Sequence, residues 1–282
     1  MAFVECNGRT IGYDDSGEAD LPAMLFAHPL GMSRQVWTEV TTRLRGRWRC
    51  IAWDLPGHGN SAGLTRPVSA HDLAADAQAL LAHLHIERCA FVGTSIGGVI
   101  GQALLLDTPA LLSCAVLTNT GATIGQPEAW HTRATRVRDE GLAQIAPELS
   151  QRWFADTYKQ ARPASLAGWT IQLARTDDES YARLCELLAE TDFRGQLAGV
   201  EAPVALIAGA EDPATPIATL QALAEELHSA RLITLDHVAH VPSVEDSAAF
   251  SEALCSACGE HDPSPPDDKR ARETGSGVAD PR

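Results

Sequence analysis

The chain has 282 residues, of which 45% are hydrophobic and 21% are charged. This length and composition indicate a globular protein with one large or two ordinary domains and a substantial core. The net charge of −15 argues against a nucleic-acid partner, because nucleic-acid binding usually needs a basic surface. It does not exclude an anionic small-molecule substrate, since a local cation in a pocket can outweigh a distant, diffuse field.

The distribution of apolar residues and cysteines predicts a cytoplasmic protein with no membrane segment. No stretch approaches about 18 uninterrupted apolar residues, and residues 1–7 lack a basic region followed by an apolar one. The seven cysteines are odd in number and scattered, which is typical of reduced thiols. Cys255 and Cys258 form a C-x-x-C pair, but without a second pair or histidines at ligand spacing we expect no metal site there.

The first 120 residues alternate short apolar runs with helix-like spacing. Asn7-Gly8 tolerates positive φ and predicts a tight hairpin between the first two strands. The predicted strands are 3–6, 10–13, 23–27, 50–53, 89–92 and 114–118, and the predicted helices are 73–84 and 96–106. Such alternation favours an α/β fold with a mostly parallel central sheet flanked by helices, and it places function at the carboxyl ends of the strands.

The alternation stops near residue 121 and resumes after residue 191. The segment 121–191 is predicted to form several helices, rich in Trp, Arg and Glu, as a helical cap inserted after the sixth strand. Strands at 204–208 and 231–235 and helices at 220–227 and 247–255 are expected to follow. Residues 1–120 and 192–258 would therefore form the core, and the Pro-rich, polar residues 259–282 are expected to be a disordered tail.

The central motif is Gly93-Thr-Ser-Ile-Gly97, which lies between a predicted strand and a predicted helix. This Gly-x-Ser-x-Gly pattern in this context predicts a nucleophile elbow, with Ser95 on a sharp turn near a helix N-terminus. A bare match is a weak signal, because glycine-rich turns without chemistry are common. The flanking strand and helix patterns strengthen it.

A serine nucleophile needs a base, and the base needs an acid that orients it, in the chain order Ser, Asp or Glu, His. Asp212 follows the strand at 204–208, and His240 follows the strand at 231–235. Both loops are expected at the edge of the sheet where Ser95 lies. We therefore predict Ser95, Asp212 and His240 as a catalytic triad.

Other residues could take these two roles. His237 is nearer the last strand, and His28 and His58 also lie in loops at strand ends, whereas His240 is deeper in its loop and has apolar neighbours. For the acid, Glu211 is adjacent to Asp212, and Asp236 is too close in sequence to the base to be its expected partner. An oxyanion hole needs two backbone N–H groups, for which Leu30 and Ile96 are the candidates by position.

Together these motifs resemble the α/β-hydrolase family over residues 3–254 and, within it, the 3-oxoadipate enol-lactonases. The family motifs that carry the likeness are His28-Pro-Leu-Gly31, Asp54-Leu-Pro-Gly-His-Gly59, Gly93 to Gly97, Gly209-Ala-Glu-Asp212 and His240. The subfamily stretches are Cys185 to Leu197 with Thr191 to Arg194, Ile207 to Pro216, and Ala239-His240 followed by Val244-Glu245. Two departures are Ile96, where the family commonly has Met, and Pro242, where it often has a polar residue. Because Ile96 would contribute only its backbone, we expect catalysis to survive that change.

The resemblance implies hydrolysis of 3-oxoadipate enol-lactone, a small lactone that bears a carboxylate, through an acyl-enzyme in aromatic catabolism by the β-ketoadipate pathway. No cofactor or metal is expected for this reaction. The cap should supply a cation for the carboxylate. Trp130, Arg133 and Val137 share one helical face, so Arg133 is the expected anion-binding residue, with Trp130 and Trp153 as pocket walls.

Two other functions remain open at this point. The first is another serine hydrolase of the same fold, such as a carboxylesterase or a hydrolase of carbon–carbon bonds in meta-cleavage products. The second is a ligand-binding protein that uses the pocket without turnover, since a fold does not establish activity. The sequence does not indicate an oligomeric state.

Overall fold

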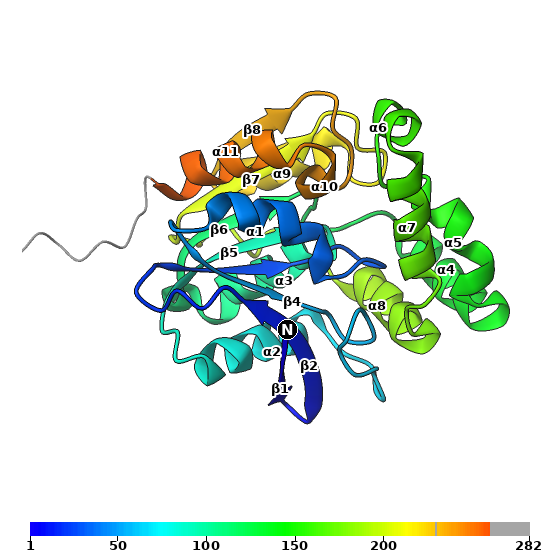
Figure 1. The fold of residues 1–282 in the computed structure, drawn as a ribbon, viewed down its shortest axis with the longest axis horizontal. Helices are drawn as coiled ribbons and strands as arrows, with labels where there is room; N and C mark the ends of the chain where they lie inside the picture. The colour runs from blue at the N-terminus through cyan, green and yellow to red at the C-terminus, as the bar shows by residue number, and fades with distance from the viewer. Residues whose placement is uncertain (229, 260–282) are drawn as a thin grey trace, which may run out of the picture.

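A computed structural model describes residues 1–228 and 230–259 of the chain. Within these residues, eight strands form one sheet in the order β1-β2-β4-β3-β5-β6-β7-β8. The strands are β1 (Ala2–Cys6), β2 (Arg9–Asp15), β3 (Ala23–Ala27), β4 (Arg49–Trp53), β5 (Cys89–Thr94), β6 (Leu112–Thr118), β7 (Val204–Gly209) and β8 (Arg231–Leu235). Only the β1–β2 and β2–β4 pairs are antiparallel, which confirms the predicted mostly parallel sheet (Figure 1).

The burial of the strands explains their sequence patterns. Every residue of β3, β5, β6 and β7 is buried, as expected for parallel strands covered on both faces, and these strands are continuous apolar runs. The edge strand β1 instead alternates between buried and accessible residues. The turn between β1 and β2 has positive φ at Asn7 and Gly8, which confirms the predicted hairpin.

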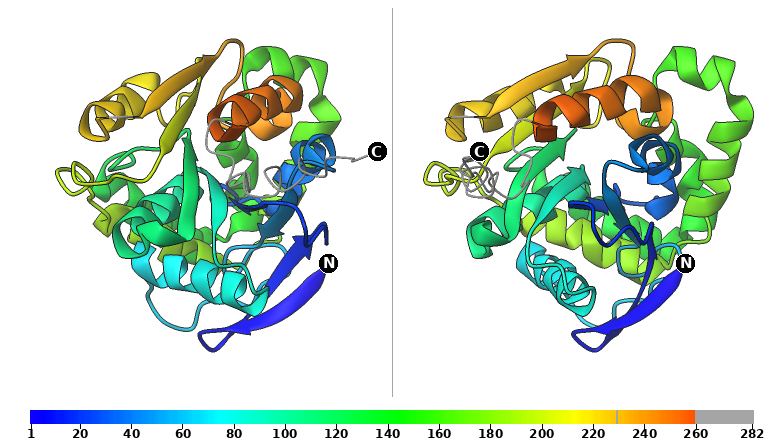
Figure 2. Two further views of the ribbon diagram at one scale, coloured as in Figure 1. Left: turned by 90° about the vertical axis from the view of Figure 1, so that its left-hand side faces the viewer. Right: turned by 60° about the vertical axis from the view of Figure 1, so that its left-hand side comes forward.

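Helices cover both faces of the sheet. Helices α1 (Thr38–Leu44) and α11 (Ser247–Cys258) pack together on one face, and α2 (Ala70–His83) and α3 (Ile96–Asp107) pack together on the other (Figures 1 and 2). Helix α9 (Ile217–Glu226) contacts β7 and β8. Short 3-10 segments lie at Arg34–Trp37 and Pro109–Leu111, and α10 (Pro242–Glu245) precedes α11.

Between β6 and β7 the chain forms the helical cap that the sequence predicts. The cap helices are α4 (Pro127–Glu140), α5 (Leu142–Ser150), α6 (Asp156–Ala161), α7 (Pro163–Leu173) and α8 (Asp178–Glu190). They gather at one side of the sheet, drawn in green in Figure 1. Helices α4 and α8 pack closely on one another, and α5 packs on α7.

The described part of the chain ends directly after α11. Gly259 is the C-cap of α11, and the rest of the predicted tail, residues 260–282, lies outside the described residues.

The two cysteines of the C-x-x-C pair lie in α11. Cys255 and Cys258 are free thiols, and the Sγ atom of Cys258 lies 3.8 Å from that of Cys114. In the part of the chain that the structure describes, no helix is long and apolar enough to cross a membrane.

Candidate active site

Ser95 stands on the sharp turn between β5 and α3. Its backbone has φ 59° and ψ −119°, a conformation that non-glycine residues rarely adopt and that clusters at functional sites. Its N–H donates to the carbonyl of Thr118 at 3.0 Å, and its carbonyl accepts from the hydroxyl of Thr120 at 2.8 Å. The turn is thus held from β6 and the loop that follows it.

The glycines of the motif are required by close backbone approach. A Cβ atom on Gly93 would lie 2.2 Å from the carbonyl oxygen of Gly97, and one on Gly97 would lie 2.2 Å from that of Ala27. Both distances are far below any real carbon–oxygen contact. The strand, the turn and the helix can meet around Ser95 only because these two positions lack a side chain.

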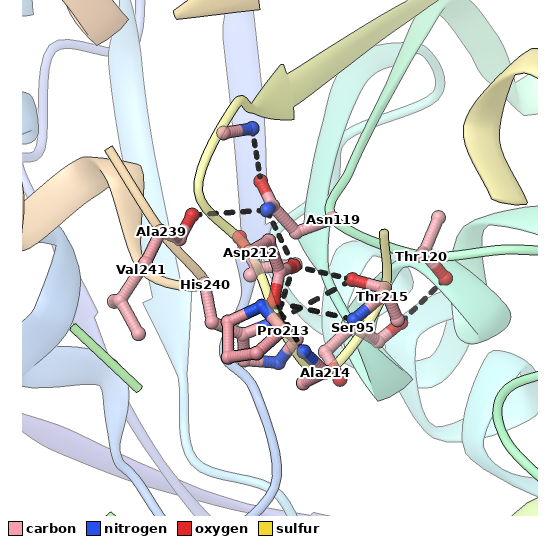
Figure 3. A network of polar contacts seen from close by, with 12 residues as sticks. Ser95, Asn119, Thr120, Asp212, Pro213, Ala214, Thr215, Ala239, His240 and Val241 are labelled. Carbon is pink, nitrogen blue, oxygen red and sulfur yellow. Dashed lines mark hydrogen bonds and ion pairs between the residues drawn. The ribbon is translucent and has the colours of Figure 1, made fainter. Parts of the chain in front are cut away.

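Asp212 and His240 form a buried pair beside Ser95 (Figure 3). The Nδ1 atom of His240 lies 2.8 Å from Oδ2 of Asp212, and each of the three residues is at least 94% buried. Because the carboxylate accepts the proton on Nδ1, the Nε2 atom is left as the basic nitrogen. Ser95 and His240 line the same cavity.

Asp212 is held by more donors than the histidine alone. The side-chain amide of Asn119 donates to its Oδ2 at 2.7 Å and the Thr215 hydroxyl at 2.5 Å, while the Ala214 N–H donates to Oδ1 at 2.8 Å. Burial by itself would raise the pKa of Asp212, but the charge of His240 and the hydrogen bonds from His240, Asn119 and Thr215 lower it to about 2. The carboxyl is therefore ionised throughout the range in which a histidine can act as a base.

The two predicted oxyanion donors are Ile96 and Leu30, which lies in the loop after β3. Ile96 is the first residue of α3, so its N–H has no acceptor within the helix. Leu30 lines the cavity beside Ser95, and its neighbour Gly31 donates its N–H to Nε2 of His58 at 3.0 Å. The loop that bears Leu30 is thus fixed from the loop after β4.

His28 and His58 connect these two loops by hydrogen bonds as neutral side chains. The Nδ1 of His28 contacts the carbonyl of Pro29 at 2.8 Å, and its Nε2 accepts the N–H of Leu55 at 2.9 Å. His58 is arranged in the same way, with Nδ1 2.9 Å from the carbonyl of Pro56. Burial lowers the pKa of His28 to about 4 and that of His58 to about 3.

The alternative acid and base residues lie away from this pair. The side chain of His237 is 86% exposed and pairs with Glu211 at 3.4 Å. Asp236 is exposed. His28 and His58 are occupied by backbone groups on both ring nitrogens, so among the candidates considered only His240 is paired with a buried carboxylate and lines the cavity with Ser95.

The cavity has a volume of about 160 Å³ and lies between the sheet edge and the cap. Its lining residues are Leu30, Ser95, Ile124, Gly125, Gln126, Ala129, Trp130, Arg133, Leu149, Arg152, Trp153, Tyr181, Ala214 and His240. The three cap residues that the sequence singles out, Trp130, Arg133 and Trp153, are all among them.

Arg133 is oriented by an aromatic side chain. Its guanidinium carbon lies 4.5 Å from the ring centroid of Trp130, a cation–π arrangement, and Tyr181 lines the same cavity. Arg136 and Arg138, on the same helix, instead pair with exposed glutamates. Within the described residues, no group of three or more His, Cys, Asp or Glu side chains is arranged to hold a metal ion.

Two residues of the site, Asn119 and Arg152, have no signal in the sequence, and two more, Thr215 and Glu245, appear there only within the stretches that resemble the enol-lactonases. Asn119 and Thr215 hold Asp212, Glu245 contacts the loop that carries His240, and Arg152 is a second arginine in the cavity wall. The Arg152 guanidinium lies 3.5 Å from the carbonyl of Pro213, the residue after Asp212. Polar loop residues and exposed arginines are too common for their positions to be predictive.

Comparisons with known proteins place this geometry among hydrolases. Residues 24–253 match the sequence model described as the Alpha/beta hydrolase family. The chain is 36% identical over 244 residues to 3-oxoadipate enol-lactonase 2 of Acinetobacter baylyi, covering 86% of this chain and 91% of that protein. It is 31% identical over 252 residues to a putative carbamate hydrolase RutD of Pseudomonas savastanoi, covering 84% and 93%.

Among solved structures, the enol-lactonase from Burkholderia xenovorans superposes with a TM-score of 0.88. The sequence identity is 30%, and the superposition covers 92% of this chain and all of the other. The sheet, the flanking helices and the inserted cap are therefore the predicted α/β-hydrolase fold.

Proposed function

The chain belongs to the alpha/beta hydrolase family and is similar to enzymes that hydrolyse esters; from this premise we propose that it is a 3-oxoadipate enol-lactonase with Ser95, His240 and Asp212 as its catalytic triad. The observation that carries the proposal is the buried Asp212–His240 pair, whose histidine lines one cavity with Ser95 and Arg133. A nucleophile and base lie at one side of the cavity, and a cation for a carboxylate lies in its wall.

The first half-reaction opens the lactone ring. The Oγ atom of Ser95 attacks the lactone carbonyl while Nε2 of His240 takes its proton, and Asp212 stabilises the resulting cation. The N–H groups of Leu30 and Ile96 hold the oxyanion. The ring carbon–oxygen bond then breaks, and the departing enol oxygen receives the proton from His240. An enol leaves more readily than an ordinary alcohol, so this step asks less of the acid.

The second half-reaction releases the product. His240 takes a proton from water, the water oxygen bonds to the acyl carbon, and Ser95 leaves with the proton returned by His240. The enol product tautomerises to the ketone, 3-oxoadipate. Neither half-reaction needs a cofactor. We place this activity in the cytoplasm as a step of aromatic catabolism by the β-ketoadipate pathway.

Arg133 is the proposed partner of the carboxylate side arm. Its stacking on Trp130 fixes the guanidinium, and a fixed guanidinium loses less conformational entropy when it binds a carboxylate. Trp153 forms an apolar wall beside the ring, and Arg152 adds a second positive charge to the cavity lining. Both charges favour an anionic substrate over a neutral ester.

The direct test is the loss of enol-lactone absorbance in the presence of wild type and of Ser95→Ala. We expect rapid loss with wild type and a rate near the uncatalysed background with the variant. If wild type leaves the lactone intact but hydrolyses 4-nitrophenyl acetate through Ser95, the triad stands and the substrate assignment is wrong.

Arg133→Met tests the carboxylate site separately. Methionine keeps much of the length and apolar contact of arginine but removes the charge. A charge-assisted hydrogen bond contributes about 1.5–3 kcal/mol, so kcat/KM for the lactone should fall by roughly tenfold to a hundredfold, with little change for 4-nitrophenyl acetate. Arg136→Met, one turn away and paired with Glu140 and Glu148, is the matched control. Equal losses on both substrates would contradict a role in carboxylate binding.

A further inference from the structure

Glu245 lies in α10, directly after the loop that carries His240. Its Oε1 atom accepts the backbone N–H groups of Ala239 at 3.0 Å and Val241 at 3.3 Å, the two residues that flank His240. Its Oε2 atom accepts the N–H of Ala155 at 2.7 Å, in the segment between α5 and α6. One carboxylate therefore joins the histidine loop to the cap.

A second hydrogen bond runs between the same two segments. The backbone N–H of His240 donates to the carbonyl of Trp153 at 3.1 Å, and the Trp153 side chain lines the cavity. The position of His240 is thus set partly by the cap segment 153–155. Glu245 is the side chain that closes this connection.

The carboxylate of Glu245 contacts three backbone donors and forms no ion pair within the described residues. Burial raises its pKa to about 7, although the three backbone N–H groups and the charge of His240 act in the opposite direction. Other charged or titratable side chains around the adjoining surface groove are Glu39, Arg43, Tyr158, Arg162 and Asp246. Among the ion pairs of the described residues, no cation is paired with Glu245, so its carboxylate is stabilised mainly by backbone donors.

We propose that Glu245 is a positioning residue for His240 and that it works only as the carboxylate. An ionised carboxylate has only acceptor atoms and can accept hydrogen bonds from all three N–H groups. The protonated form carries an O–H of its own, which would face an N–H donor. Protonation therefore loosens the histidine loop from the cap. The proposal rests on the catalytic roles proposed for Ser95 and His240, and it does not depend on the identity of the lactone.

Glu245→Gln tests the acceptor requirement with almost no change in shape. Glutamine has one acceptor oxygen, so in either orientation its NH2 group faces Ala155 or the pair Ala239 and Val241. The rate of inactivation by a fluorophosphonate reports the reactivity of Ser95 and His240 without needing the lactone. We expect this rate to fall about tenfold at pH 8, since small displacements of a reacting group cost up to about a hundredfold. Glu252→Gln, on the exposed side of α11, should match wild type.

The pH profile separates positioning from general structural support. Reaction of wild type should slow more steeply toward acidic pH than reaction of Glu245→Gln, because protonation of Glu245 adds to the loss in wild type alone. The same steepness in both proteins would overturn the proposal, and so would an unchanged inactivation rate at pH 8. Because the probe is not a lactone, failure to hydrolyse lactone contradicts only the proposed function.

A second variant reaches the same contact from the cap. Ala155 has φ −57°, which a proline can adopt, so Ala155→Pro removes the N–H that donates to Oε2 and leaves Glu245 in place. We expect slower inactivation in Ala155→Pro as well. In the double variant Glu245→Gln/Ala155→Pro, the inactivation rate should fall by less than the product of the two single-variant factors. Independent, multiplying effects would show that the contact does not position His240.

Discussion

At the scale of single residues, the turn that carries Ser95 depends on two positions where neighbouring backbone leaves no room for a side chain. Gly93 and Gly97 are predictable from the sequence, because the elbow motif already specifies that backbone meets backbone on both sides of Ser95. The partners of Asp212 are not predictable in this way. Asn119 lies 93 positions earlier in the chain, and a lone Asn after a strand has many possible roles. Its φ of 46° is a hint that only coordinates reveal.

Asp212→Asn tests how far activity depends on the carboxylate that orients His240. The amide keeps the shape but removes the charge that stabilises the cation of His240, and an NH2 group directed at Nδ1 favours the wrong tautomer. In a serine protease the same change lowers kcat by about 10⁴-fold, and we expect a loss of at least about a thousandfold here. Steady-state hydrolysis of 4-nitrophenyl acetate provides the measurement.

The matched control for that variant is Asp236→Asn. Asp236 is exposed in the loop just before His240, so its loss should change kcat less than about twofold. A larger loss in Asp236→Asn than in Asp212→Asn would show that the acid has been assigned to the wrong residue.

At the scale of elements, the alternation of apolar runs and helical spacing was sufficient to predict the strands, the order of the layers and the place of the cap. The pattern does not predict helix α1, although Val40 and Leu44 recur at helical spacing and are buried. It is only seven residues long, and so short a pattern is hard to distinguish from a loop. The bounds of the individual cap helices are not predicted for a related reason. Helix α7, for example, buries only Leu173, so it has no clear apolar face in the sequence.

His58 shows how one element depends on another at this scale. It accepts the N–H of Gly31 and stacks on Tyr181 of α8, with ring centroids 6.4 Å apart. His58→Ala would leave that N–H without an acceptor and open a cavity. We expect a loss of about 3 kcal/mol in the free energy of unfolding, together with a lower kcat, because the adjacent Leu30 would lose its fixed position.

Urea unfolding monitored by tryptophan fluorescence would measure the effect of His58→Ala. His83→Ala, on the exposed end of α2, is the control and should stay within about 0.5 kcal/mol of wild type. A stable His58→Ala protein with normal kcat would mean that the loop after β3 holds its shape without the histidine.

At the scale of the whole molecule, the charge distribution reconciles an acidic protein with the anionic substrate that we propose for it. The net charge is −15, yet two arginines line the active-site cavity. Charges on the surface are screened beyond about 8 Å at physiological ionic strength, so the cations nearest the ligand decide its binding. Composition argues against nucleic acid as a partner, but only the fold shows that Arg133 and Arg152, 19 positions apart in the sequence, line one cavity.

Three groups, His28, His58 and Glu245, contribute to how stability depends on pH between 4.5 and 6.5. The pKa values of His28 and His58 are lowered on folding, so the stability that they contribute is present above about pH 6.5 and is lost as the pH falls toward 4 and 3. The pKa of Glu245 is raised from 4.5 to about 7. Its contribution has the opposite sign: it is present below pH 4.5 and is lost as the pH rises through 7.

Between pH 4.5 and 6.5 the two histidines and Glu245 therefore oppose one another. Unfolding takes up about two protons at the histidines and releases about one from Glu245, so wild type should lose stability on acidification by about 1.4 kcal/mol per pH unit. His58→Ala removes one of the two uptakes and should flatten this slope. Glu245→Gln removes the release and should make it roughly twice as steep. Urea unfolding at half-unit intervals of pH measures all three slopes, and parallel slopes in the three proteins would show that these buried groups do not control the acid sensitivity of the fold.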